Sequence, residues 1–199
     1  MTTLHPSSAE TSATDTAHDH EDHRMFGVAT FLVADAMTFA GFFAAYLTFH
    51  AVNPLQPDAI YELELPLPIL NTVLLLVSSA TFHKAGQNLR KGANQVCRQW
   101  LMLTAVLGLA FLVSQMVEYF TLPFGLTDNL FASTFYALTG FHGLHVTLGA
   151  LMILIVWWQA RPQGGRITSE APFPLEAAEL YWHFVDGIWV ILFVILYLL

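Results

Sequence analysis

The chain has 199 residues, of which 55% are hydrophobic and only 11% are charged. So high an apolar content at this length excludes an ordinary soluble domain and indicates an integral membrane protein. The formal net charge of −8 says little about partners, since roughly half of the acids lie in the first 23 residues or in the loop over 51–66, and no nucleic-acid partner is expected. The single cysteine, Cys97, excludes an internal disulfide.

Residues 1–23 are rich in Ser, Thr, His and acids. They contain no basic region followed by an apolar stretch, so they predict a disordered polar cytoplasmic tail rather than a cleavable signal peptide. Within them, residues 18–23 have the composition of a loose metal-binding tract. Because nothing in so flexible a segment would fix a coordination geometry, we interpret this tract as solvated tail.

Five apolar segments follow, each close to the about 20 residues that cross about 30 Å of hydrocarbon. The connecting loops are too short to house a second domain. Residues 24–199 are therefore predicted to form a single all-α domain of five transmembrane helices. The helices are expected at approximately 25–49, 65–82, 100–120, 131–157 and 175–199.

All seven cations lie on one side of this predicted topology. They precede the first span, or lie between the second and third or the fourth and fifth. By the positive-inside rule, the N-terminus is then cytoplasmic and the C-terminus outside. The cations are Arg24, Lys84, Arg90, Lys91, Arg98, Arg161 and Arg166.

The last two predicted spans carry five ionisable side chains at depth. One span has two histidines three residues apart, and the other has an acid, a histidine and an acid at i, i+4 and i+7, so each set occupies one helix face. Each such group costs roughly 2.5 to 3.5 kcal/mol at the centre of a bilayer, so they are expected to face one another or a wet cavity rather than lipid. The set is His142, His145, Glu179, His183 and Asp186.

Counting the rise of 1.5 Å per residue predicts which of these groups share a depth. His142 should level with Asp186 and His145 with His183, and Asp35 in the first span reaches a similar depth. A second polar group is expected near the outer end of the third span, where a carboxylate can reach water. This outer cluster comprises Gln115, Glu118 and Asp128.

Three interpretations of the deep polar set are compatible with the residues alone. Imidazoles with carboxylate support could ligate a metal or haem. The same groups could relay protons through a region of low dielectric. Alternatively, they could hydrogen-bond across helices and fix the register of a bundle that has no hydrophobic driving force in lipid.

Two longer runs carry a resemblance to a known family. They are residues 133–146, containing Ser-Thr-Phe-Tyr and Thr-Gly-Phe-His-Gly-Leu-His-Val, and residues 176–186, containing Glu-Ala-Ala and Tyr-Trp-His-Phe-Val-Asp. Weaker matches lie at 70–78 and 115–128. In this order the chain resembles subunit III of the haem-copper terminal oxidases, the cytochrome c oxidase type in particular. From Arg24 onward it is similar to the last five of the family's usual seven helices, as in shorter bacterial versions.

The resemblance implies a function for the whole complex and a supporting role for this chain. The complex passes electrons from cytochrome c to oxygen and pumps protons, with haem and copper in neighbouring subunits. This chain would bind beside subunits I and II, protect the active site against inactivation during turnover, support proton uptake and hold phospholipids in a cleft. No catalytic residue, metal or other cofactor is then expected in this chain, and the structural interpretation of the polar set is favoured. The expected location is a bacterial cell membrane, or an internal one.

Two residues are carried over from the family individually. Asp35 lies where the family has a carbodiimide-reactive glutamate, one methylene longer. Arg24 matches a family arginine at the inner end of the same helix, which resembles those that hold lipid phosphate, and guanidinium geometry suits bidentate phosphate pairing.

Alternatives remain at this point. A quinol oxidase or a complex associated with nitric oxide reductase would have a similar subunit, because these residues do not identify the electron donor. From a different class, a small membrane transporter of protons or metal would also place ionisable groups at depth. Against it, the chain has no internal repeat and no pair of broken helices.

Overall fold

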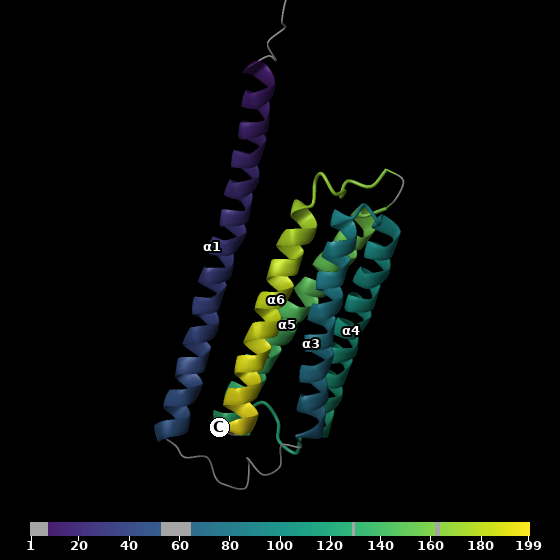
Figure 1. Ribbon diagram of the computed structural model, residues 1–199. Coiled ribbons are helices and arrows are strands. Elements are labelled where there is room, and N and C mark those ends of the chain that lie inside the picture. Colours follow the sequence, from purple (N-terminus) through teal and green to yellow (C-terminus); the bar gives the residue numbers. More distant parts are fainter. Residues whose placement is uncertain (1–7, 53–64, 129, 162–163) are drawn as a thin grey trace, which may run out of the picture.

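The computed structural model describes residues 8–52, 65–128, 130–161 and 164–199, which are helical with no strand (Figure 1). Five long helices are followed by one π-helical turn at the C-terminus. In chain order they are α1 (Ser8–Val52), α3 (Pro66–Arg90), α4 (Asn94–Thr121), α5 (Leu130–Gln159), α6 (Phe173–Phe193) and η1 (Val194–Leu198).

The prediction of an all-α protein with five spans is confirmed. Over the described residues, five helical stretches are long and apolar enough to cross a membrane. They are His23–Phe49, Pro66–Arg90, Asn94–Thr121, Leu130–Gln159 and Phe173–Leu198. The helices extend beyond the predicted apolar segments; α3, for example, continues from Phe82 to Arg90. Hydropathy locates the part of a helix that faces hydrocarbon, whereas polar residues continue the same helix into the interface.

Helix α1 starts much earlier than its apolar part. It begins at Ser8, so residues 8–23, which composition predicts to be a disordered tail, are helical. Adding turns to an existing helix costs less than nucleating one, and the alanines and acids here tolerate helix. Residues 1–7 and the side chains before His23 lie outside the described part, so the possible metal-binding tract over 18–22 is not observed.

Helices α3, α4, α5 and α6 pack together, and α1 packs against α5 and α6 at the side of this group (Figure 1). The tight turn between α3 and α4 depends on Gly92, whose φ of 71° suits glycine. The Gly92 amide donates to the Leu89 carbonyl at 2.8 Å, which ends α3 with a satisfied carbonyl.

The core of the group is built around Trp182 of α6. This fully buried side chain lies against two glycines on neighbouring helices, Gly108 of α4 and Gly149 of α5. A Cβ would lie 2.6 Å from the indole at Gly108 and 2.8 Å from it at Gly149. The indole Nε1 donates to Ser78 Oγ of α3 at 2.9 Å. One side chain therefore contacts all three of the helices packed with α6 in this group.

Basic residues gather on aromatic rings at the end of the bundle where α3 ends and α6 begins. Arg24 lies 5.9 Å from the ring centroid of Phe173, and Lys84 lies 4.8 Å from that of Trp100. Arg98 lies in the same way on Trp157, at 4.5 Å. Cations stacked on interfacial aromatic rings are typical of a membrane boundary, so this end suits the predicted cytoplasmic side.

Candidate functional site

The most extensive polar contacts lie between α3 and α6. His83 Nδ1 donates to Glu179 Oε1 at 2.9 Å, and His183 Nε2 lies 3.6 Å from the same oxygen. The Ser79 hydroxyl donates to the Asp186 carboxylate, so the Nδ1–H of His183 donates to Ser79 Oγ, at 2.8 Å. We call these five residues the α3–α6 polar chain. It continues over about two turns of α6 and uses both ring nitrogens of His183.

A glycine leaves space for the α3–α6 polar chain, and an ion pair lies beside it at the basic end of the bundle. A Cβ at Gly86 would lie 2.8 Å from Glu179 Oε2, so a larger residue here would displace the end of the Glu179 side chain. One turn further towards the end of α3, Arg90 lies 3.4 Å from Glu176 Oε1. The chain of polar groups therefore begins at the basic end of the bundle and leads inward.

A separate pair joins α1 to α5. His145 Nε2 lies 3.3 Å from Asp35 Oδ2, and its Nδ1 donates to the Phe141 carbonyl at 2.7 Å. Both side chains of the pair are about nine-tenths buried. The imidazole lies against the rings of Phe39 and Phe141, with centroids 5.1 and 4.6 Å away. This apolar surrounding leaves each of the two ionisable groups dependent on the other.

His142 belongs to neither group. Its ring is fully buried and lies 5.8 Å from the Phe111 centroid and 5.1 Å from that of Trp189. Neither ring nitrogen has a hydrogen-bond partner among the described residues. This side chain packs as an aromatic ring.

The five deep groups of α5 and α6 were predicted to face one another or a wet cavity, and in the described part of the chain the histidine side chains of α5 do not meet the deep groups of α6. His145 pairs with α1, His142 packs among aromatic rings, and the other three bind α3. Depth along each helix was counted from the sequence, but the direction in which a side chain leaves the helix decides its neighbour. Two members of the polar chain, Ser79 and His83, were missed, although their i, i+4 spacing in an apolar span is a detectable signal.

The outer cluster forms in part. Gln115 Nε2 donates to Glu118 Oε2 at 3.1 Å, and the hydroxyl of Tyr197 donates to Glu118 Oε1 at 2.7 Å. Asp128 instead accepts from the Gly125 amide at 2.6 Å, within its own turn. Tyr197 was not foreseen, because nothing in its spacing links the end of the chain to α4.

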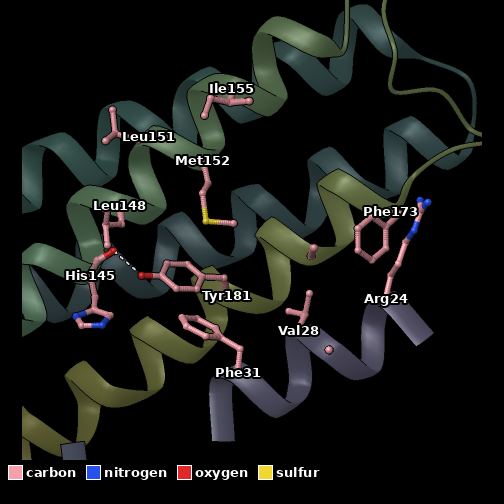
Figure 2. A pocket seen from close by; sticks show the side chains of 12 residues that line it. Arg24, Val28, Phe31, His145, Leu148, Leu151, Met152, Ile155, Phe173 and Tyr181 are labelled. Carbon is pink, nitrogen blue, oxygen red and sulfur yellow. Dashed lines mark hydrogen bonds between the residues drawn. The ribbon is translucent and has the colours of Figure 1, made fainter. Parts of the chain in front are cut away.

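An apolar groove of about 760 Å³ separates α1 from α5 and α6 (Figure 2). Arg24 and Phe173 lie at one end of it and His145 at the other, with leucines and Met152 of α5 along its wall. The Tyr181 hydroxyl donates to the His145 carbonyl at 3.2 Å. The groove thus has a cation at the membrane boundary and an almost entirely apolar wall beneath it.

Among the residues that the structure describes, no group of three or more His, Cys, Asp or Glu side chains could hold a metal ion. Several polar groups instead link one helix to another, as in the α3–α6 polar chain and the pair of Asp35 and His145. The fold and these contacts define a multi-pass helical membrane protein stabilised by cross-helix polar pairs.

Comparison with known proteins narrows this class of membrane protein to one family. A family model described as Cytochrome c oxidase subunit III matches residues 9–199. The protein named cytochrome c oxidase subunit 3 of Synechocystis sp. is 51% identical over 183 residues, covering 92% of this chain and 78% of that protein. Its namesake in Thermostichus vulcanus is 43% identical, covering 94% and 92%, and that of Mus musculus is 35% identical, covering 86% and 68%. The chain belongs to the cytochrome c oxidase subunit III family.

Proposed function

We propose that this chain is the non-catalytic subunit III of an aerobic cytochrome c oxidase in a bacterial membrane. In this proposal it binds beside subunits I and II, which hold the haem and copper, and stabilises the catalytic subunit during turnover. The observation that supports it best is the use of the polar groups. The α3–α6 polar chain and the pair of Asp35 and His145 each join two helices, which is how a bundle keeps a rigid shape in lipid.

Deleting the chain from the oxidase tests this role. We expect the remaining complex to keep its haem and copper absorption bands and to lose activity progressively over repeated turnovers, whereas the full complex stays active. Absorption spectra measure whether the haem and copper bands are retained, and oxygen consumption over many turnovers measures the loss of activity. A haem or copper band that disappears with this chain would contradict the absence of a redox centre, and equal lifetimes would contradict the protective role.

We further propose that the groove beside α1 holds phospholipid. Its apolar wall suits acyl chains, and the Arg24 guanidinium at its open end suits a phosphate, which it can pair in bidentate fashion. Phe173 orients the guanidinium by stacking, at 5.9 Å. The lipid would then fill the space between α1 and the other helices.

Arg24→Ala is expected to lower the phospholipid that co-purifies with the oxidase by about one molecule per complex, because Arg24 is the one cation among the described residues that line this groove. Arg24→Lys should lose less, since it keeps the charge without the planar fork. Arg166→Ala provides the matched control, because Arg166 is exposed in the loop between α5 and α6 and does not line the groove. Mass spectrometry of extracted lipid measures the change, and unaltered lipid in Arg24→Ala would refute the assignment.

A further inference from the structure

Two histidines of the α3–α6 polar chain remain accessible on helices that are long and apolar enough to span a membrane. The side chain of His83 is 55% exposed and that of His183 is 41% exposed. Counting 1.5 Å per residue, His183 lies about 15 Å along α6 from Phe173, whereas His83 directly precedes Lys84 and lies nearer the membrane boundary. A polar side chain at the depth of His183 faces protein or water rather than acyl chains, because hydrocarbon offers it no hydrogen bond.

The residues beside these histidines form a surface suited to another helix. On α3, Leu76, Ala80 and His83 are exposed at i, i+4 and i+7, and on α6 Leu180, His183 and Gly187 are exposed at i, i+3 and i+7. We call these six residues the α3–α6 outer face. Small residues that let backbones approach, next to polar ones that hydrogen-bond across, characterise helix contacts in membranes.

The glycine in this face, Gly187, is not required by packing among the described residues of this chain. A Cβ at Gly187 would find nothing within 4 Å, in contrast to the crowded Gly108 and Gly149. Gly187 lies about 21 Å along α6 from Phe173 and hence near the middle of the bilayer. A lipid headgroup at the boundary does not reach this depth.

The outward face of α4 is different. From Met102 to Phe120 every exposed side chain of α4 is apolar, as expected for a helix that meets acyl chains. They include Val106, Leu109, Val113 and Met116. The contrast shows that the polarity of the α3–α6 outer face is a local feature and does not extend over the whole bundle surface.

The hydrogen bonds of this face are incomplete within the described part of the chain. His83 uses Nδ1 with Glu179, and no protein atom there meets its Nε2. This nitrogen is reachable from outside, because the His83 side chain is 55% exposed. A hydrogen-bonding side chain of an occupant can meet it, whereas an acyl chain cannot.

We propose that the α3–α6 outer face is covered in the assembled oxidase by a membrane-spanning helix of another subunit. This helix packs closely over Gly187 and Ala80 and presents a polar side chain to His83. A second copy of this chain fits less well. A two-fold axis would place the same face opposite, and the Glu179 carboxylate of that copy is already bound to its own His83 and His183. The inference rests on the proposed function, because it needs a complex with other subunits.

A photoreactive residue placed on this face tests the proposal in the whole oxidase. Benzoyl-phenylalanine at Leu76, which is 53% exposed, is compared with the same residue at Leu109 on α4, which is 59% exposed. After irradiation of native membranes, we expect the probe at Leu76 to form an adduct with another subunit, identified by mass spectrometry. The probe at Leu109 should form at least about five times less protein adduct. Only lipid adducts at Leu76, an adduct with a second copy, or equal yields from both positions would overturn the proposal.

The role of His83 is tested on the same probe. His83→Leu should lower the adduct yield at Leu76 several-fold, and His83→Gln, which retains hydrogen bonding, should restore most of it. Co-purification of the chain with the haem-containing subunits is measured in parallel. If the chain co-purifies and Leu76 forms no subunit adduct, this inference alone is wrong. If it does not co-purify, the proposed function fails and this inference fails with it.

Discussion

Replacing Trp182 by Ala is expected to lower the free energy of unfolding of the full chain in mixed micelles by about 3 kcal/mol. The buried indole fills the space that Gly108 and Gly149 leave, and it donates to Ser78. In water-soluble cores, Trp-to-Ala substitutions cost about 3 to 5 kcal/mol, including the transfer of apolar surface from water. Lipid is as apolar as the core, so the transfer of apolar surface contributes little here. The cost then comes from lost packing and one lost hydrogen bond, and we expect the lower end of that range.

Two variants separate packing from other causes. Trp182→Phe keeps most of the ring in the cavity and loses the bond to Ser78, so it should cost less than half as much as Trp182→Ala. Trp158→Ala removes a surface indole that Arg161 stacks on at 4.6 Å, and it should cost under about 1 kcal/mol. Unfolding titrations with dodecyl sulfate compare the three. Equal losses for Trp182→Ala and Trp158→Ala would show that the indole is not the packing centre of the bundle.

The number and order of the spans were predictable because hydropathy reports directly on contact with hydrocarbon. Helix ends were less predictable. The stretch from His83 to Arg90 is too polar to read as a span, yet its backbone groups remain bonded in the helix of α3. In α1, residues 8–23 carry no apolar pattern, and their helix follows from continuation of the adjacent span.

The partners of the deep polar residues were mostly not predictable. His145 and Asp35 were predicted to lie at similar depth, and the structure pairs them. His142 was predicted to lie level with Asp186, but Asp186 binds Ser79 and His142 packs among aromatic rings. A rotation of about 100° separates successive residues on a helix, so a small change in helix orientation replaces one partner by another. Contacts between segments distant in sequence, such as that of Tyr197 with Glu118, leave no local pattern to read.

The pair of Asp35 and His145 offers a test of whether the deep polar residues act as one network. Its two side chains are nearly buried, and His145 Nε2 lies 3.3 Å from Asp35 Oδ2. The rings of Phe39 and Phe141 lie against the imidazole. Each single change to Ala leaves the other group without its partner. We therefore expect a coupling energy of about 1 to 2 kcal/mol in a double-mutant cycle on the full chain. Cross-helix polar contacts in membranes contribute about 0.6 kcal/mol on average and up to about 1.7 kcal/mol, and the burial of both side chains favours the upper part of this range.

The matched control lies on the same helix. His142 is three residues from His145 but contacts Phe111 and Trp189, so a cycle of Asp35→Ala with His142→Ala should show coupling within about 0.5 kcal/mol of zero. Asp35→Asn should recover part of the loss, because an amide still meets the imidazole. Equal coupling of Asp35 to both histidines would mean that the five deep groups behave as one network after all. Coupling to His145 alone would mean that α1 is held to α5 by one specific pair, so that the groove between α1 and the other helices has a fixed width at its deep end.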